Sequence, residues 1–272
     1  MAGDGPPAAA FFDLDKTLIE GSSAFQFARA AYRAKLLGRG QLLSDAAANV
    51  RFRLRGASDE DSLALRERIA ASLEGTRVTE LERLGVDVLA GILPRVYPKM
   101  LALAHEHQDA GRRSYIVTAA SQELADILAR VMAFDGALGS EISEVVDGVY
   151  TGKPAGLFIY GAGKARAIEE LAAAEGIDLA QSYAYSDSES DLPMLRAVGH
   201  PVAVNPDARL ARIARHEGWQ ILRFDRLRRR LRMAAVVGVA AAAGGAGSVA
   251  LVGRTRSGGQ RSQLAQGWRC SS

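Results

Sequence analysis

The stretch FFDLDKTLIE (residues 11–20) places two aspartates, Asp13 and Asp15, one residue apart directly after an apolar run. The preceding residues 8–12, AAAFF, are typical of a short buried strand. Charged side chains are rarely buried completely unless they are paired. Two carboxylates at the end of a predicted core strand therefore indicate a chemical role rather than packing.

The rest of the chain alternates predicted strands and helices, which favours an α/β fold with a mostly parallel sheet and helices on both faces. Residues 136–154 are predicted to form a hairpin that turns at Asp147-Gly148. In parallel sheets, ligands bind beyond the carboxyl ends of the strands. The other strands are expected within residues 114–121, 183–199, 200–207 and 219–224, and helices at residues 99–111, 122–132 and 163–176.

Between the first and second predicted strands, apolar residues recur at a spacing of three to four, which predicts an inserted helical module. Its four expected helices cover residues 22–37, 41–56, 58–75 and 77–91, with Ser58 as a predicted N-cap. The predicted division is a disordered N-terminus at 1–7, a core domain at 8–21 and 92–225, a helical cap at 22–91, a basic stretch at 226–232, a candidate transmembrane helix at 233–252 and a disordered tail at 253–272.

Four short motifs resemble those of the haloacid dehalogenase-like (HAD) phosphatases. DLDKT at 13–17 resembles the first motif, and IVTAAS at 116–121 resembles the second. Lys164 in GAGKARAI matches the third, and SDSESDLPML at 186–195 matches the fourth. Their order and spacing are similar to the phosphoserine-phosphatase-like branch, subfamily IB, which carries a helical C1-type cap between the first two motifs. The resemblance covers roughly residues 8–225.

The resemblance implies a Mg²⁺-dependent phosphomonoesterase that acts on a small phosphorylated metabolite through an aspartyl-phosphate intermediate. Asp13 would be the nucleophile, and Asp15 would protonate the leaving oxygen and then deprotonate the attacking water. Mg²⁺ would be held by the side chains of Asp13 and Asp187 and by the backbone carbonyl of Asp15, with Asp191 nearby.

Further residues are expected to contact the phosphate or the substrate. The hydroxyl of Thr118 and the next amides, beginning at Ala119, would hold phosphate oxygens at a helix N-terminus. By resemblance, Lys164 would bring positive charge to the phosphate and to Asp13, and Thr17 would hold the loop by a local hydrogen bond. Ser190 is a further candidate for substrate contact.

The substrate itself is not determined by the sequence. Phosphoserine phosphatases carry a glutamate nine residues after the nucleophile, where this chain has Ser22, and Glu20 is a candidate replacement. Ser186 and Ser190 replace the glycine and the asparagine of the last motif, GDxxND. Phosphoserine is therefore a candidate substrate only.

Two arginines of the predicted cap are candidates for an anionic substrate. Arg51 and Arg55 share one face of the expected second cap helix. The alternative is that this face is simply solvated.

Charge is distributed unevenly along the 272 residues. From Arg223 onward there are ten arginines and one acidic residue, which leaves 24 basic and 30 acidic residues before it. A uniformly basic nucleic-acid-binding protein would not show this pattern, so no nucleic-acid partner is predicted. The single cysteine, Cys270, cannot form an internal disulfide, and no secretory signal is recognised, so the catalytic domain is expected in the cytoplasm.

The tail offers a candidate membrane contact. Residues 233–252 form an uncharged run of the length needed to cross a bilayer, although eight alanines and four glycines dilute it. A preceding arginine cluster favours the cytoplasmic side and anionic lipid. A single span anchoring the protein to the cell membrane is one reading, and a disordered Ala/Gly tail is the other. The alternative function is a catalytically idle HAD fold used as a tethered binding or regulatory protein; no oligomeric state is predicted.

Overall fold

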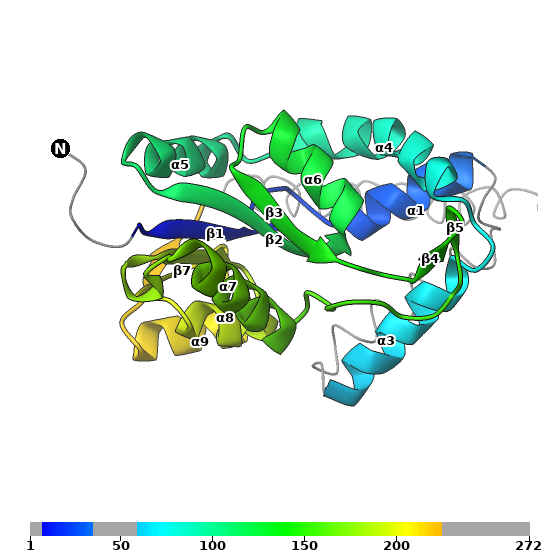
Figure 1. Cartoon of the computed structure of the whole chain (residues 1–272). Helices are drawn as coiled ribbons and strands as arrows, with labels where there is room; N and C mark the ends of the chain where they lie inside the picture. The colour runs from blue at the N-terminus through cyan, green and yellow to red at the C-terminus, as the bar shows by residue number, and fades with distance from the viewer. Residues whose placement is uncertain (1–6, 35–58, 225–272) are drawn as a thin grey trace, which may run out of the picture. The chain divides into compact units, whose positions relative to one another are not determined.

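The central sheet has its strands in the order β3-β2-β1-β6-β7-β8, and every pairing in it is parallel. The computed structural model describes residues 7–34 and 59–224, and the sheet lies within them (Figure 1). The predicted α/β fold with a mostly parallel sheet is confirmed. The strands are β1 Ala9–Asp13, β2 Arg113–Ser121, β3 Gly136–Ser140, β6 Tyr183–Ser186, β7 His200–Val204 and β8 Gln220–Leu222.

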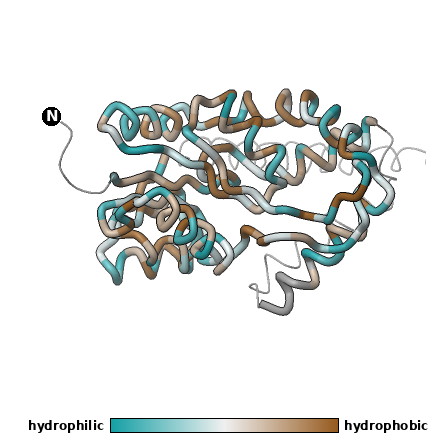
Figure 2. The backbone as a smooth tube through the Cα atoms, in the orientation of Figure 1, coloured by the Kyte–Doolittle hydropathy of each residue, from teal (hydrophilic) through white to brown (hydrophobic). Residues whose placement is uncertain are grey.

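Helices cover both faces of this sheet (Figure 1). One face carries α5 and α6, and the opposite face carries α7, α8 and α9. In Figure 2 the hydropathy colour alternates along the helices, as expected when each helix turns one apolar side toward the strands. These elements are α5 Pro98–Asp109, α6 Gln122–Val131, α7 Ala162–Glu175, α8 Leu192–Arg196 and α9 Ala208–His216, with short 3-10 turns at η2 Leu179–Gln181 and η3 Glu189–Asp191.

Strand β1 lies at the centre of the sheet and is buried along its whole length. Phe11 stacks on Tyr115 on one face, with ring centroids 5.8 Å apart, and Phe12 stacks on Tyr185 on the other at 4.5 Å. A parallel strand that is covered on both faces is expected to be apolar throughout, as the AAAFF run is. Asp13 is the last residue of this strand and therefore lies at its carboxyl end.

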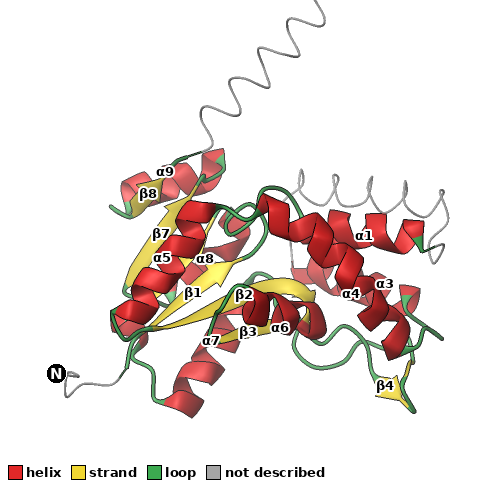
Figure 3. Ribbon diagram, turned by 90° about the horizontal axis from the view of Figure 1, so that it is seen from above, coloured by secondary structure: helices red, strands yellow, loops and turns green. Residues whose placement is uncertain are grey.

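Apart from α5, the helices between β1 and β2 lie at the carboxyl-end side of these strands (Figures 1 and 3). They are α1 Ser23–Arg33, α3 Asp59–Ser72, α4 Val78–Ile92 and the short η1 Leu93–Arg95. Three of the four predicted cap helices are thus present, with α1 packed against α4. The second predicted cap helix at 41–56 lies outside the described residues, as do Ser58 and both cap arginines. Because residues 1–223 form one compact unit, the division into core and cap stays a prediction.

The hairpin predicted at 136–154 forms only in its central part, where β4 Val145–Val146 and β5 Val149–Tyr150 pair antiparallel. Residues 136–140 instead form β3, which pairs parallel with β2. The turn residues of the hairpin, Asp147 and Gly148, both have positive φ, 50° and 75°, as a type I′ turn requires. Strand β5 also joins the α3–α4 connection: the amide of Gly75 donates to the carbonyl of Tyr150 at 2.9 Å. The hairpin therefore links the strand that precedes it to the cap helices.

The predicted membrane span at 233–252 and the basic stretch at 226–232 lie outside the described residues. Within residues 7–34 and 59–224, none of the helices has the length and apolar character needed to cross a bilayer.

Candidate active site

Five predicted site residues are gathered at the carboxyl end of the sheet, and all of them are buried. Asp13 ends β1, Thr118 lies in β2, and Asp187 follows β6 directly. Lys164 lies in the first turn of α7, and Asp191 ends η3. Each is 7% exposed or less. Because an isolated buried charge is costly, these groups are expected to be paired.

Lys164 forms a charged bridge between two of the aspartates. Its Nζ lies 2.5 Å from Asp13 Oδ1 and 2.8 Å from Asp191 Oδ2. Ser186 Oγ donates to the same Asp191 oxygen at 2.7 Å. Asp191 thus has one carboxylate oxygen occupied by a lysine and a serine, which is the arrangement of a positioning carboxylate. Its predicted additional role near the metal stays a prediction.

Burial and neighbouring charges shift the pKa values of these groups. Burial raises the pKa of Asp13, the Lys164 ammonium opposes this, and the negative charges of Asp191 and Asp187 add to it. Burial also raises the pKa of Asp187, to about 6, and the ammonium of Lys16 at 3.5 Å opposes the shift. Burial alone would lower the pKa of Lys164, but the two carboxylates outweigh it and the net shift is upward.

Asp15 is held by a different element from Asp13. Its Oδ2 accepts a hydrogen bond from Ser22 Oγ at 3.0 Å, and its Oδ1 accepts one from the amide of Ser23 at 2.8 Å. The intervening Lys16 has a φ of 59°, which turns the chain sharply after Asp15. The two aspartates of the DLD motif therefore have partners from separate elements. Asp13 pairs with Lys164 of α7, whereas Asp15 accepts hydrogen bonds from residues at the start of α1.

The predicted local hydrogen bond of Thr17 is wrong. Thr17 Oγ1 is buried and has no hydrogen-bond partner among the residues that the structure describes. Backbone hydrogen bonds hold this loop in its place, because the amides of Leu18 and Ile19 both donate to the carbonyl of Leu14 at 3.0 Å.

The strand predicted at 114–121 and the helix predicted at 122–132 both form, as β2 and α6, so Thr118 does not stand at the helix start itself, and its contact with phosphate stays a prediction. Strand β2 continues to Ser121, whose hydroxyl caps α6 by accepting from the amide of Leu124 at 3.4 Å. Thr118 instead lies at an irregularity in the β2–β3 pairing, between Val117 and Ser121. Its Oγ1 accepts from the amide of Ala120 at 3.2 Å, within the part of β2 where the pairing shifts as at a β-bulge.

The other predicted contact residues are less closely tied to this cluster. Ala119 is half-buried and follows Thr118 in the same bulge. Glu20 is half-buried, and its amide donates to the carbonyl of Arg95 at 2.8 Å. Ser190 shares a hydrogen bond with Ser188 through their hydroxyls at 3.0 Å. Arg51 and Arg55 lie outside the described residues.

The carboxylates present fit a Mg²⁺ ion that is bound together with a phosphate. Within residues 7–34 and 59–224, no group of three or more histidine, cysteine, aspartate or glutamate side chains is gathered closely enough to enclose a metal. Mg²⁺, however, is usually held by one or two carboxylates with retained waters and substrate phosphates. Asp13 and Asp187 are buried and close enough for the charge of Asp187 to raise the pKa of Asp13. A dication between them would relieve this repulsion.

Sequence reasoning missed the positions of Lys16 and Ser22. In the sequence Lys16 is only one residue of the DLDKT motif, whereas in the structure its ammonium lies 3.5 Å from a carboxylate oxygen of Asp187. Ser22 was considered only for the substrate, yet its hydroxyl binds Asp15. A serine that follows Gly21 and precedes a helical pattern was a signal for an N-cap position, which Ser22 occupies at α1.

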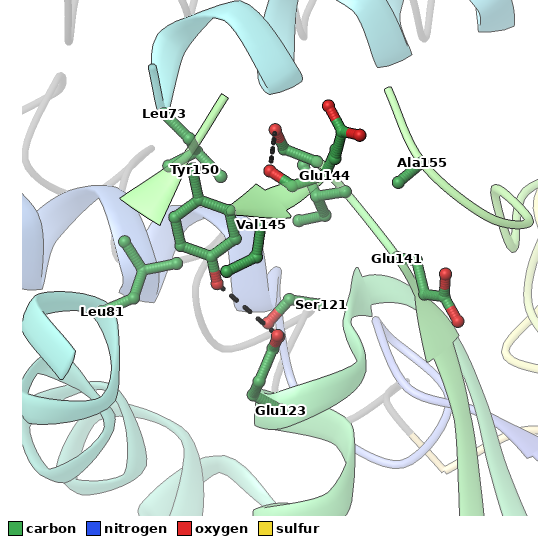
Figure 4. A pocket seen from close by; sticks show the side chains of 11 residues that line it. Leu73, Leu81, Ser121, Glu123, Glu141, Glu144, Val145, Tyr150 and Ala155 are labelled. Carbon is green, nitrogen blue, oxygen red and sulfur yellow. Dashed lines mark hydrogen bonds between the residues drawn. The ribbon is translucent and has the colours of Figure 1, made fainter. Parts of the chain in front are cut away.

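A cavity of about 260 Å³ lies between the cap helices, the hairpin and the start of α6 (Figure 4). Ser121, the last residue of β2, lines this cavity, but none of Asp13, Asp187 and Asp191 does. Tyr150 Oη donates to Glu123 Oε1 at 3.5 Å across the cavity (Figure 4), and burial together with this carboxylate raises the pKa of Tyr150 to about 12. The charged lining residues are Glu123, Glu141 and Glu144, and the others are Leu73, Leu81, Ser121, Ile142, Ser143, Val145, Tyr150 and Ala155.

Known proteins resemble this chain over most of its length. A family model described as haloacid dehalogenase-like hydrolase matches residues 10–196. "Phosphoserine phosphatase SerB1" of Mycobacterium tuberculosis is 39% identical over 252 residues, which cover 92% of this chain and 82% of that protein. "Histidinol-phosphatase" of Neisseria meningitidis serogroup C is 29% identical, over 79% of this chain and 98% of that protein. A solved structure of a protein of unknown function from Bordetella pertussis has a TM-score of 0.70 and 27% identity, over 80% of this chain and 98% of that chain.

Proposed function

The chain belongs to the haloacid dehalogenase-like hydrolases, and on that premise we propose that it hydrolyses phosphate monoesters of small metabolites through a phosphorylated Asp13. The observation that carries the proposal is the position of Asp13. It ends the central strand, is buried, and has one carboxylate oxygen fixed by Lys164 at 2.5 Å. A carboxylate fixed in one position supports this proposal, because phosphoryl transfer depends mainly on positioning and charge stabilisation.

The proposed reaction has two steps. In the first, Asp13 attacks phosphorus, the ester P–O bond breaks, and Asp15 gives its proton to the departing alcohol oxygen. In the second, Asp15 takes a proton from water, which attacks phosphorus and releases phosphate and free Asp13. Mg²⁺ held by Asp13, Asp187 and the backbone carbonyl of Asp15 would supply positive charge for the phosphate. Lys164 supplies a further positive charge from the chain itself.

We propose phosphorylated amino alcohols as the substrate class, with phosphoserine as one candidate. The names of two relatives refer to phosphate esters of this kind. The cavity beside β2 carries three carboxylates but is not lined by Asp13 or Asp187, so the support for this class comes from those names. Ser22 lacks the carboxylate of the glutamate in phosphoserine phosphatases, and its hydroxyl donates to Asp15. Recognition of the amine is therefore assigned to another part of the site.

The test is a phosphatase assay of the full chain with p-nitrophenyl phosphate, O-phosphoserine, histidinol phosphate and glycerol phosphate, in Mg²⁺ and in excess EDTA. We expect activity in Mg²⁺ that disappears on chelation. Asp13→Asn should lose at least a hundredfold in kcat, because an amide cannot form the acyl phosphate. Asp178→Asn, which changes a carboxylate at the start of η2, is the matched control.

The alternative, an idle HAD fold used for binding, predicts no turnover with any of these esters. The intact aspartates and Lys164 favour the enzyme. Full activity of Asp13→Asn, or full activity in excess EDTA, would show that the nucleophile or the metal has been assigned wrongly.

Membrane attachment through residues 233–252 remains a separate prediction. Cells that express either the full chain or a chain ending at Arg232 can be fractionated at low and high salt. A span holds only the full chain in the membrane after a high-salt wash. If both chains stay in the supernatant at both salt concentrations, there is no anchor.

A further inference from the structure

We infer that Ser22 is a positioning residue that orients the carboxylate of Asp15 and thereby couples the acid–base group to the first cap helix. The inference rests on the proposed function, in which Asp15 transfers the proton. Ser22 Oγ donates to Asp15 Oδ2 at 3.0 Å, and the amide of Ser23 donates to Asp15 Oδ1 at 2.8 Å. With one donor on each oxygen, rotation of the carboxylate about its own axis is restrained.

The backbone before Ser22 brings it back toward Asp15. Gly21 has a φ of 98°, a conformation that L side chains rarely adopt. A Cβ at Gly21 would meet nothing within 4 Å, so the glycine is required for its conformation and not for space. The turn at Gly21 therefore serves to place the hydroxyl of Ser22 and the first amide of α1 on the Asp15 carboxylate.

Residues 18–20, just before Gly21, are hydrogen-bonded to residues 95–97, where the chain leaves the cap helices. The amide of Glu20 donates to the carbonyl of Arg95 at 2.8 Å, and the amide of Tyr97 donates to the carbonyl of Leu18 at 2.8 Å. An antiparallel bridge joins Ile19 to Val96 between these bonds. Ser22 thus lies next to the two paired segments, residues 18–20 and 95–97, that connect the cap helices to the strands of the sheet.

The nucleophile is supported differently. Asp13 is held by Lys164 of α7, a helix that covers one face of the sheet, whereas Asp15 is held by the start of α1. A displacement of α1 would therefore reorient the acid–base carboxylate and leave the nucleophile in place. Loss of the Ser22 hydroxyl should imitate such a displacement in part, because the amide of Ser23 remains.

The leaving group determines how far loss of the Ser22 hydroxyl lowers the rate of hydrolysis. When the P–O bond breaks, its electron pair stays on the departing oxygen, which takes the proton of Asp15 to become an alcohol. An alkoxide is a poor leaving group and needs that proton, whereas p-nitrophenolate is stable as an anion. General acid catalysis contributes about 10²–10⁴-fold where it is needed. Misorientation of Asp15 should thus slow alkyl esters and spare the aryl ester.

The experiment compares kcat/KM of wild type, Ser22→Ala and Ser22→Thr on p-nitrophenyl phosphate and on the alkyl phosphate that the wild type hydrolyses fastest. The ratio kcat/KM is used because it reports the steps up to departure of the alcohol. Ser72→Ala, which removes an exposed hydroxyl from α3, is the matched control. Melting temperatures of all four proteins are measured alongside.

For Ser22→Ala we expect about a tenfold loss on the alkyl ester and less than about a threefold loss on the aryl ester, a fraction of the general-acid contribution. Ser22→Thr should recover most of the alkyl activity, and Ser72→Ala should match the wild type. Equal losses on both esters, or no loss on either, overturn the inference. If the wild type itself hydrolyses neither ester, the proposed function fails first, so the two failures are distinguishable.

Discussion

Lys164 and Asp13 are 151 residues apart in the sequence, yet their charged groups lie 2.5 Å apart in the interior. The side chain of Lys164 is 4% exposed and that of Asp13 is 9% exposed. Such a pair contributes little net stability, because desolvation offsets the attraction, but removal of one partner leaves an uncompensated buried charge. The pair therefore fixes the position of Asp13, the proposed nucleophile, and the loss of stability on removing Lys164 can be measured by mutagenesis.

Lys164→Met should destabilise the fold by about 3–5 kcal/mol in metal-free buffer, because Asp13 and Asp191 then lose their shared cation. The free energy of unfolding is measured in urea with EDTA present. Asp13→Asn introduced into the Lys164→Met background should recover part of this loss, since it removes one of the two unpaired carboxylates. Lys153→Met, at an exposed lysine, is the control and should change stability little.

This cycle has a clear negative outcome. If Asp13→Asn destabilises the wild type and the Lys164→Met protein by the same amount, the two side chains are not energetically coupled. The ion pair would then have no part in holding the nucleophile.

The glycine before Lys164 is predicted to be required for activity. A Cβ on Gly163 would collide with the backbone carbonyl of Phe158, which cannot move aside as a side chain can. Gly163→Ala should therefore displace the first turn of α7 together with Lys164. We expect a lower melting temperature and a loss of more than about tenfold in kcat, the scale expected when a positioning group is misplaced. An active, fully stable Gly163→Ala protein would show that α7 adjusts without moving Lys164.

The gathering of the candidate site residues at one edge of the sheet was predictable because strand ends can be recognised from pattern. Asp13 follows the apolar run AAAFF and Asp187 follows the predicted strand YAYS, and parallel strands bring such ends to one edge. The Asp147-Gly148 turn was predictable for a similar reason, since a two-residue turn of this type demands positive φ. These predictions needed only local periodicity and one topological rule.

The features that were missed depend on tertiary contacts. The irregularity at Thr118 arises from a shift in the pairing of β2 with β3, which the pattern IVTAAS does not indicate. The Asp15–Ser22 bond depends on the return path of the chain through residues 95–97. A single sequence gives no signal for such a path, because it is set by which elements pack together.

His107 is predicted to make the protein less stable in mild acid. It is buried at 4% exposure, its Nδ1 accepts from Arg112 Nε at 2.8 Å, and its Nε2 is 2.8 Å from Tyr185 Oη. Burial, assisted by the charge of Arg112, lowers its pKa from 6.5 to about 4. The unfolded chain thus binds the proton at a higher pH than the folded chain does. Stability is full above about pH 6.5 and falls as the pH drops toward 4.

The measurement is the free energy of unfolding at pH 7.5 and at pH 5. His107 should account for about 2 kcal/mol of the difference between them, from the separation of the two pKa values. His107→Gln should remove this contribution to the difference between the two pH values, whatever the absolute stability of the variant. His216→Gln, which changes an exposed histidine of α9, should leave the difference as it is in the wild type. An unchanged difference in His107→Gln would mean that the histidine is protonated equally in both states.

Two glycines of α4 are predicted to respond to the same substitution with opposite signs. A Cβ on Gly85 would meet only Ile127 Cδ1 at 3.6 Å, an ordinary contact, so Gly85→Ala should stabilise the fold by about 0.5–1 kcal/mol through helix propensity. A Cβ on Gly91 would lie 2.6 Å from Oε1 of the buried Gln26, where α1 packs on α4.

Gly91→Ala must therefore move Gln26 or separate the two helices, and overpacking of this kind costs about 1–3 kcal/mol. Urea unfolding of both variants tests the pair together, since propensity alone would make both of them more stable. If Gly91→Ala also stabilises, then α1 does not pack on α4 as closely as the structure has it. Because α1 begins at the residues that hold Asp15, that result would also weaken the link between the cap and the acid–base carboxylate. Reduced melting temperature together with reduced activity on alkyl esters in Gly91→Ala is the expected outcome.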